Sequence, residues 1–310
     1  MNNVAKSMRF KLLIKFNDFK FMKLRCYANY ASSNLHEHQQ NLMAKGLPKV
    51  KPIQGVKHVV LVCSGKGGVG KSTTAVNIAT SLKVLNPSKN IGILDTDLFG
   101  PTIPLMMNLN ETPLLTKDDL MEPLINYGVK CISIGFLIKE GAPVIWRGLM
   151  VMQALDKLLR QVFWDSIDYL IVDTPPGTGD TLLSLIQNIP ISGVVLVTTP
   201  HIAALNVTRR GAAMFQKLKV PIIGMVENMS SIKCPICKEY SPLFGTGTSA
   251  LADKLDISLL QSIPMQQCIT DSSDKGIPVV VAEPTGEEAG AYKEIGKKIV
   301  KFLETKDELL

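Results

Sequence analysis

Short apolar runs alternate with longer amphipathic segments along most of the chain. Runs of strand length lie at His58–Ser64, Ile91–Asp97, Lys130–Phe136, Tyr169–Asp173, Gly193–Thr199, Ile222–Asn228 and Leu260–Pro264. Segments of helix length lie at Lys71–Leu85, Gly148–Val162, Thr181–Asn188, Ala203–Leu218, Ser249–Leu255 and Glu287–Leu303. Strands that alternate with helices form βαβ units, whose strands lie parallel in one sheet. The pattern therefore predicts an α/β fold with a doubly wound, mainly parallel sheet.

The positive charge of the chain is concentrated at its start. The net charge is +7, but residues 1–27 hold seven basic residues and one acid, and the rest hold 27 basic and 26 acidic residues. A body so close to neutral argues against a broad nucleic-acid-binding surface, and we expect no nucleic-acid partner.

Residues 1–27 have the pattern of a mitochondrial transit peptide. Between the basic residues, apolar side chains recur at helical spacing at Val4, Met8, Leu12, Phe16 and Phe19. Arg25 lies two residues before Tyr27, whose bond to Ala28 resembles a processing site. We therefore expect localisation in the mitochondrial matrix; an ordinary basic tail is the alternative.

The strongest motif follows the first expected strand and opens the first expected helix. It matches the phosphate-loop pattern G-x-x-x-x-G-K-[ST], and it consists of Gly65, Lys66, Gly67, Gly68, Val69, Gly70, Lys71, Ser72 and Thr73. Glycines let backbone N–H groups converge on phosphate oxygens, and the helix directs its positive end to the same anion. We expect Lys71 to reach the β- and γ-phosphates of ATP and the Ser72 hydroxyl to bind Mg²⁺.

Acidic residues close two of the other expected strands. Asp95 and Asp97 end one strand, and Asp173 ends another. Ligands of open α/β sheets bind beyond the carboxyl ends of the strands. An acid that closes an apolar strand near a phosphate loop holds Mg²⁺ directly or through water, and we assign this role to Asp173.

The chain has six cysteines, of which only Cys234 and Cys237 are closely spaced. This is no disulfide framework and fits a reducing compartment. A C-x-x-C pair is typical of a redox disulfide, half of a zinc site or half of a cluster site. This pair falls in an expected loop, and a symmetric dimer would supply the four thiolates that zinc or a [4Fe–4S] cluster takes. The donor set alone leaves cluster and zinc equally open.

Lys66 is a second lysine that a standard phosphate loop does not need. With it the loop resembles the deviant Walker A motif of the Min and Par positioning ATPases, the nitrogenase iron protein and the Mrp/NBP cluster carriers. The resemblance to the Mrp/NBP family covers about residues 46–303. It rests on the cysteine pair and on the stretches Gly65–Ser72, Asp95–Pro101, Trp146–Gly148, Asp173–Asp180 and Glu227–Ser230. The presequence and Lys45–Ile53 look most like the mitochondrial branch of that family.

The resemblance implies a homodimer that binds ATP and Mg²⁺. In the family the extra lysine crosses to the partner's nucleotide, which would make Lys66 catalytic. Asp97 would orient the attacking water, Asp95 would support the metal site, and Asn228 would bind the adenine edge.

The resemblance also decides the metal in favour of a [4Fe–4S] cluster, shared by Cys234 and Cys237 of two subunits. Such a protein would deliver clusters to mitochondrial apoproteins, with subunits of respiratory complex I as the expected recipients. A slow ATPase activity would serve that transfer.

Two departures from the family pattern stand out. Cytosolic relatives carry an additional N-terminal four-cysteine site, where this chain has only Cys26. His201 and Asn206 stand where relatives usually have Gln and Asp. The second change bears on the rate of hydrolysis and not on the fold.

Four parts are expected along the chain. Residues 1–27 would be the transit peptide, and the polar residues 28–57 a flexible lead-in. Residues 58–304 would form a P-loop ATPase domain of the MinD/Mrp type that includes the C-x-x-C cluster loop, followed by a tail at 305–310.

Two rival functions make different demands on the sequence. A Min/Par-type positioning ATPase with a dimer-bridging structural zinc needs a membrane or DNA surface. The apolar stripe of the last expected helix, Tyr292, Ile295, Ile299, Phe302 and Leu303, could lie on a membrane, but we favour packing against the sheet. A small-molecule kinase needs a substrate site with its own general base, which the sequence does not indicate.

Overall fold

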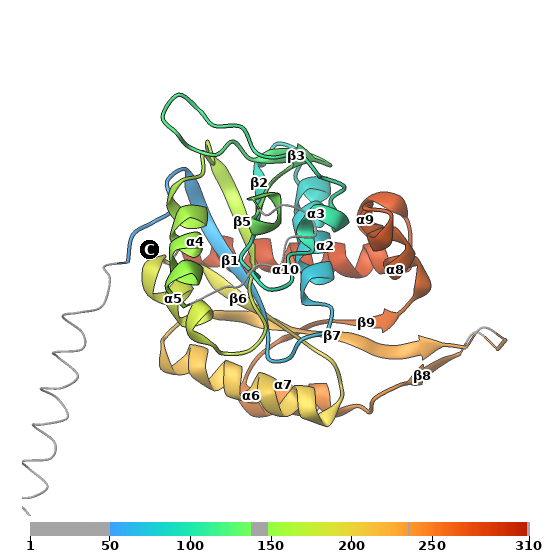
Figure 1. The fold of residues 1–310 in the computed structure, drawn as a ribbon. Helices are drawn as coiled ribbons and strands as arrows, with labels where there is room; N and C mark the ends of the chain where they lie inside the picture. Colours follow the sequence, from blue (N-terminus) through green and yellow to red (C-terminus); the bar gives the residue numbers. More distant parts are fainter. Residues whose placement is uncertain (1–49, 138–147, 235, 238, 309–310) are drawn as a thin grey trace, which may run out of the picture. The chain divides into compact units, whose positions relative to one another are not determined.

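The computed structural model describes residues 50–137, 148–234, 236–237 and 239–308 (Figure 1). The expected transit peptide and most of the expected lead-in lie outside these residues, as do Trp146 and Arg147. Val50–Leu310 form one unit by their contacts.

A mainly parallel sheet forms the centre of this unit. Its strands are β1 (Val56–Ser64), β2 (Ile91–Asp95), β3 (Leu124–Asn126), β4 (Val129–Ser133), β5 (Ile167–Asp173), β6 (Gly193–Thr198), β7 (Ile222–Lys233), β8 (Tyr240–Pro242) and β9 (Leu259–Met265). They follow the order β3-β4-β2-β5-β1-β6-β7-β8, and β9 also pairs with β7. Among the strands of the described residues, only the β3–β4 and β7–β8 pairs are antiparallel.

Helices cover both faces of the sheet. They are α2 (Lys71–Leu85), α3 (Ile103–Met106), α4 (Gly148–Arg160), α5 (Asp180–Asn188), α6 (Ile202–Lys217), α7 (Gly247–Leu255), α8 (Gln267–Asp274), α9 (Val279–Ala282) and α10 (Glu287–Asp307), with a 3₁₀ turn at Ile134–Leu137. Side chains of a strand point alternately to its two faces. Val60 and Val62 of β1 accordingly join the core under α2 and α10, and Leu61 joins the core under α4, α5 and α6.

The observed fold confirms the predicted doubly wound, mainly parallel α/β class, and α2 has the predicted bounds. Most other boundaries differ by a few residues, and α10 continues to Asp307 into the segment predicted as a tail at 305–310. Three of the differences bear on the candidate site. The strand expected to reach Asp97 ends at Asp95, and the strand expected to reach Phe136 ends at Ser133 because a 3₁₀ turn follows. Strand β7 continues beyond Asn228 to Lys233, because its last three residues pair with β8.

The short segment before β1 is packed against the body, although the sequence placed residues 28–57 in a flexible lead-in. Ile53 is buried, and the Arg160 guanidinium donates hydrogen bonds to the carbonyls of Lys51 and Pro52 at 3.0 Å. Strand β1 then begins at Val56. These contacts hold residues 51–57 against the body of the protein, although their polar sequence predicted a flexible segment.

The apolar stripe of α10 faces the protein core. Tyr292, Ile295, Ile299 and Leu303 are buried in the core that includes α2, and Phe302 is partly buried against it. No helix among the described residues is long and apolar enough to cross a membrane. Packing against the sheet layer, which we favoured from the sequence, is what the structure shows.

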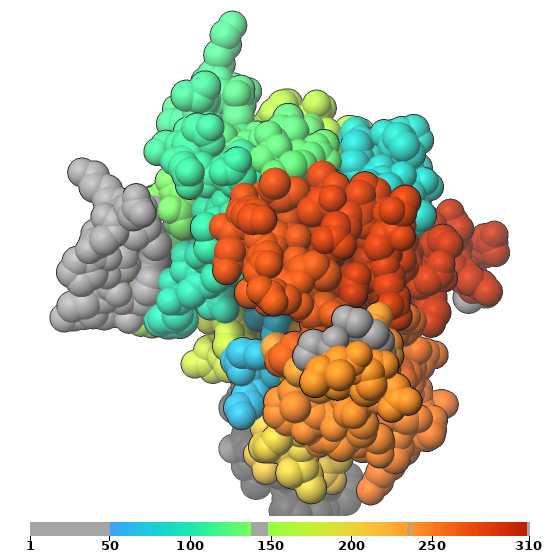
Figure 2. Space-filling model, turned by 90° about the vertical axis from the view of Figure 1, so that its right-hand side faces the viewer, coloured from blue at the N-terminus to red at the C-terminus, as the bar shows by residue number. Residues whose placement is uncertain are grey.

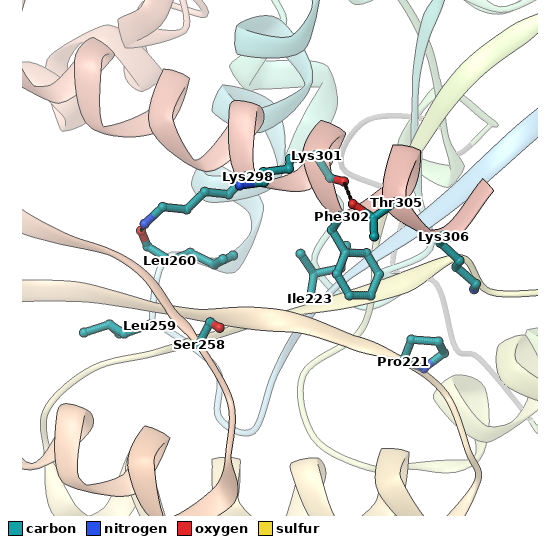
Figure 3. Close-up of a pocket in the computed structure, with 10 residues that line it drawn as sticks. All are labelled: Pro221, Ile223, Ser258, Leu259, Leu260, Lys298, Lys301, Phe302, Thr305 and Lys306. Atoms are coloured by element: carbon teal, nitrogen blue, oxygen red, sulfur yellow. Dashed lines mark hydrogen bonds between the residues drawn. The ribbon is translucent and has the colours of Figure 1, made fainter. Parts of the chain in front are cut away.

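A groove remains between α10 and the beginnings of β7 and β9 (Figure 3). It has a volume of about 730 Å³, and Ile223 and Phe302 contribute to its apolar lining. Lys298 donates a hydrogen bond to the Leu260 carbonyl at its edge. The groove lies at the amino ends of these strands. It is therefore remote from the carboxyl ends of the strands, where the phosphate loop and the acidic residues lie.

Replacing Ile295 by alanine tests this packing of α10. Removing a fully buried isoleucine side chain leaves a cavity, and we expect the free energy of unfolding to fall by about 2–5 kcal/mol. The control is Lys297→Ala, because Lys297 is exposed on the same helix and its ion pair with Glu294 is a surface pair. Urea unfolding followed by circular dichroism measures both variants, and equal small losses would contradict the buried position.

Candidate nucleotide site and cysteine hairpin

The register of three parallel strands brings the predicted acids to one place. Val62 of β1 pairs with Asp173 of β5, and Asp173 pairs with Asp95 of β2. The phosphate loop begins immediately after β1, at Gly65. The loop and both carboxylates therefore meet at the carboxyl ends of neighbouring strands, as the sequence predicted.

Asp173 is held by the first two residues of α2. The Lys71 ammonium lies 2.5 Å from one carboxylate oxygen, and the Ser72 hydroxyl donates to the other at 2.5 Å. Lys71 is 6% and Asp173 0% exposed. The carboxylate of Asp97 lies 3.8 Å from the same ammonium. An unpaired charge would be costly at this depth, so this ion pair holds the loop against β5.

Asp95 is also fully buried, and it has hydrogen-bond partners of its own. It accepts a hydrogen bond from the Ser133 hydroxyl at 2.9 Å and one from the Asp97 N–H at 3.0 Å. Burial, followed by the nearby charge of Asp173, raises the pKa of Asp95 to about 8. Burial also raises the pKa of Asp173, against the opposing effect of Lys71. Oxygen donors crowded in this way are the ligands that Mg²⁺ prefers.

Ser133 is a site residue that the sequence did not single out. It reaches Asp95 because β4 pairs with β2 in a register that places the two residues opposite each other. No short motif encodes this register, so only the expected adjacency of the two strands could have indicated it.

Asn228 contacts the phosphate loop itself. Its side-chain amide donates to the Val69 carbonyl at 2.8 Å, and the residue is buried. The expected contact with adenine stays a prediction. Lys66 has an exposed position, and its backbone carbonyl accepts a hydrogen bond from the Ser64 hydroxyl at 3.0 Å.

His201 and Asn206, the second departure from the family pattern, lie at the start of α6. His201 is the N-cap of this helix, and its Nδ1 atom accepts a hydrogen bond from the Ala203 N–H at 3.1 Å. Asn206 is exposed on the same helix. His201 thus has a capping role in the observed structure.

The cysteine pair lies in the turn of a β-hairpin, where the sequence predicted a plain loop. The ladder of β7 and β8 pairs Lys233 with Tyr240, and the Cys234 N–H then donates to the Glu239 carbonyl at 2.9 Å. Ile236, between the cysteines, is 90% exposed, and Cys237 is exposed.

Local donors favour the thiolate of Cys234. Backbone N–H groups of Cys237 and Ile236, followed by the Cys237 side chain, lower the pKa of the Cys234 thiol. Burial raises the pKa of Cys63 and that of Cys131 instead, in keeping with their expected role as structural thiols. The hairpin therefore presents two accessible cysteines, and the thiolate favoured at Cys234 is the form that binds metals.

Strand β7 contacts the phosphate loop and also forms one side of the cysteine hairpin. Asn228 on β7 contacts the loop, and the same strand continues to Lys233 beside the cysteines. Figure 2 shows this side of the molecule, with the orange segment of the hairpin and α7 below the red C-terminal helices. The structure brings Lys71, Ser72, Asp95, Asp97 and Asp173 together, and it places the cysteine pair apart from them.

Comparisons with known proteins identify the family of the chain. The family model described as ParA, NUBPL iron-transfer P-loop NTPase, matches residues 55–300. The iron–sulfur cluster transfer protein NUBPL of Mus musculus is 51% identical over 278 residues, which are 89% of this chain and 87% of that protein.

Two further proteins are similar to the chain. The mitochondrial iron–sulfur protein required for NADH dehydrogenase of Arabidopsis thaliana is 48% identical over 252 residues, 81% of this chain and 80% of that protein. A solved nucleotide-binding protein of Archaeoglobus fulgidus, in complex with ADP and with cobalt found in it, superimposes with a TM-score of 0.64 at 33% identity, covering 76% of this chain and 92% of that one. The chain therefore belongs to the family of NUBPL iron-transfer P-loop NTPases.

Proposed function

We propose that this protein is an ATP-binding carrier that transfers iron–sulfur clusters to mitochondrial apoproteins. The observation that carries the proposal is the cysteine pair, Cys237 exposed and Cys234 half-buried, in the turn of a hairpin whose first strand also contacts the phosphate loop. The names of the mouse and Arabidopsis relatives, cluster transfer and a requirement for NADH dehydrogenase, support the same function.

The cargo is a [4Fe–4S] cluster held between two copies of the chain. Each copy offers Cys234 and Cys237, and four thiolates complete the ligand set of such a cluster. The copies form a symmetric homodimer, because two identical half-sites close around one cluster on a two-fold axis. A position at the end of the hairpin lets both cysteines reach a partner without moving the sheet.

ATP with Mg²⁺ binds at the phosphate loop of each copy. Lys71 and Ser72 exchange their contacts with Asp173 for the phosphates and the metal, and Asp173 and Asp95 supply the oxygen donors around Mg²⁺. Mg²⁺ neutralises phosphate charge when bound. Asp97 holds the attacking water, and the exposed Lys66 reaches the nucleotide of the other copy. Hydrolysis is slow and changes the dimer contact, so that the cluster is accepted or released.

The carrier acts in the mitochondrial matrix on subunits of respiratory complex I. The basic segment 1–27 supports import, and the Arabidopsis relative supports the recipients. Membrane contact is not part of the proposal, because the apolar stripe of α10 is buried.

Gly70 shows how closely β7 constrains the phosphate loop. Its φ is +83°, a conformation that L-residues rarely adopt, and a Cβ atom there would lie 2.1 Å from the Asn228 amide nitrogen. Gly68 has a similar φ of +79°, but a Cβ atom at that position would meet nothing within 4 Å. The two glycines therefore separate backbone strain from collision with Asn228.

We expect Gly70→Ala to weaken ATP binding by at least about tenfold more than Gly68→Ala. Both variants carry a strain of about 1–2 kcal/mol in the left-handed conformation, but only the first displaces Asn228. Titration with a fluorescent ATP analogue measures both affinities. Asn228→Ala removes the colliding amide, so the double variant Gly70→Ala, Asn228→Ala should lose less ATP affinity than the product of the two single losses. Equal losses in the two single glycine variants would contradict the contact between β7 and the loop.

Substitution of both hairpin cysteines by serine should abolish cluster binding. Anaerobic reconstitution of the wild type with iron and sulfide should give about four irons per dimer, because a [4Fe–4S] cluster takes four thiolates. The variant Cys234→Ser, Cys237→Ser should retain ATP binding and lose this iron. The control Cys131→Ser alters a buried thiol and should keep it. Iron that persists in the double variant, or zinc bound in preference to the cluster, would contradict the carrier function.

A further inference from the structure

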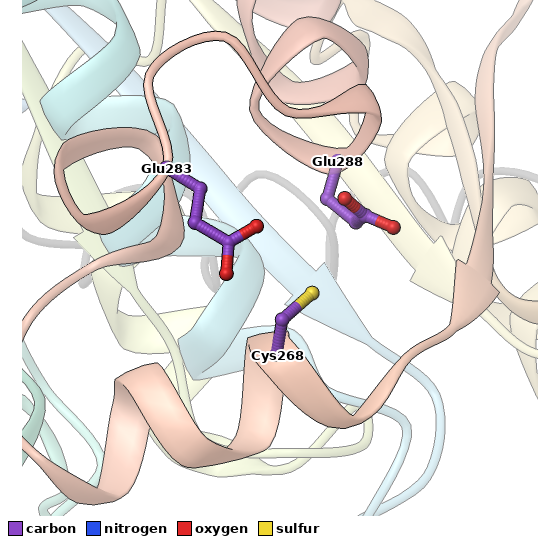
Figure 4. A group of neighbouring side chains, drawn as sticks. All are labelled: Cys268, Glu283 and Glu288. Atoms are coloured by element: carbon purple, nitrogen blue, oxygen red, sulfur yellow. The ribbon is translucent and has the colours of Figure 1, made fainter.

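A second group of metal-binding side chains lies near the C-terminal end of the chain. Cys268 at the start of α8, Glu283 after α9 and Glu288 in the first turn of α10 place one ligand atom each within 4.8 Å of one another (Figure 4). The three residues come from different elements, and the close-up shows the thiol between the two carboxylates. This group shares no residue with the phosphate loop or the hairpin.

The group is unusual because its acidic atoms have no cationic partner. Glu288 is 8% exposed, and neither carboxylate forms a salt bridge within the described parts of the chain. A first-turn acid interacts favourably with a helix dipole, which would explain Glu288 alone. It does not explain why a thiol and a second carboxylate approach it.

Tyr292 is an independent sign that a ligand is missing from this region. Its side chain is fully buried, and its hydroxyl has no hydrogen-bond partner in the described structure. Tyr292 and Glu288 are four residues apart on α10 and therefore share one face of the helix. The pKa of the Tyr292 hydroxyl is raised, first by burial and then by the nearby charges of Cys268 and Glu288. A buried hydroxyl without a partner is rare in native proteins.

We propose that Cys268, Glu283 and Glu288 bind one divalent ion of borderline softness, such as Zn²⁺. Thiolate and carboxylate ligands are both accepted by Zn²⁺, and three protein ligands leave the fourth tetrahedral position for water. The ligand distances of such a site place its donor atoms about 3.5 Å apart. The exposed Glu283 side chain is able to move the remaining distance. The Tyr292 hydroxyl would donate a hydrogen bond to one of the ligand atoms or to the bound water.

The ion would join the C-terminal elements to the helix that follows the phosphate loop. The Val280 N–H of α9 donates to the Asn77 side chain of α2 at 3.3 Å, and the Tyr292 hydroxyl lies near the Thr74 side chain of α2. Thr74 in turn donates to the Gly70 carbonyl at 2.8 Å. The site would thus stabilise the support of the phosphate loop, a role that does not depend on cluster transfer.

Metal titration of the full chain tests the site. The variant Cys234→Ser, Cys237→Ser removes the hairpin thiols, and chelator treatment without nucleotide removes bound metal. Titration with Co²⁺ should then produce a thiolate-to-cobalt absorption band that saturates at one Co²⁺ ion per chain. Addition of Zn²⁺ should displace the Co²⁺ ion and remove the band. In this background Cys268→Ser should abolish the band, and Glu283→Gln or Glu288→Gln should weaken Zn²⁺ binding by at least about tenfold.

The matched control is Glu287→Gln. Glu287 is the neighbour of Glu288 on α10, but its carboxylate accepts a hydrogen bond from the Tyr240 hydroxyl at 2.9 Å and is not part of the group. It should bind Zn²⁺ like the background protein. The proposal is overturned if the background protein shows no thiolate band, if the band survives Cys268→Ser, or if Glu287→Gln weakens binding as much as Glu283→Gln. Because Glu283 is exposed, its substitution tests the site without disturbing the fold.

Discussion

The parallel pairing of β1, β5 and β2 is the constraint on which the nucleotide site depends. It fixes Asp173 beside the phosphate loop and Asp95 beside Asp173. The buried contact of Lys71 with Asp173 then holds the start of α2 in place. A shift of one residue in this register would turn each of these side chains to the opposite face of the sheet. Burial of both faces by helices prevents such a shift, so the hydrophobic core and the chemistry share one cause.

Strand β7 connects that site to the cysteine hairpin. Asn228 contacts the phosphate loop, and Cys234 begins the turn six residues later. Six residues of extended strand span about 20 Å at most. The connection is not uniform, because the pairing of β7 with β9 shifts register after Asn228 and Met229 has a φ of +55°. A bend at this point gives the hairpin its own direction while the first half of the strand stays in the core. Nucleotide and cluster would therefore act on the two ends of one element.

Much of this arrangement could be predicted from the sequence, because buried parallel strands are continuous apolar runs and a phosphate loop has a strict spacing. The meeting of Asp95 with Asp173 followed from the rule that such strands end at one edge. The hairpin was missed because Met229–Lys233 are mostly polar and do not alternate. Ser133 and the group of Cys268, Glu283 and Glu288 were missed for another reason: their partners are set by register and by packing between elements, which leave no local motif.

The central claim is that ATP and the cluster bind to one and the same dimer. Two ligands that each require the same contact between subunits must increase each other's affinity, and this coupling is reciprocal. The most direct test compares the affinity of a non-hydrolysable ATP analogue for the cluster-loaded and the cluster-free wild type, measured anaerobically by calorimetry. The account predicts binding at least about fivefold tighter to the loaded protein. Equal affinities would show that the two sites are independent and would contradict it.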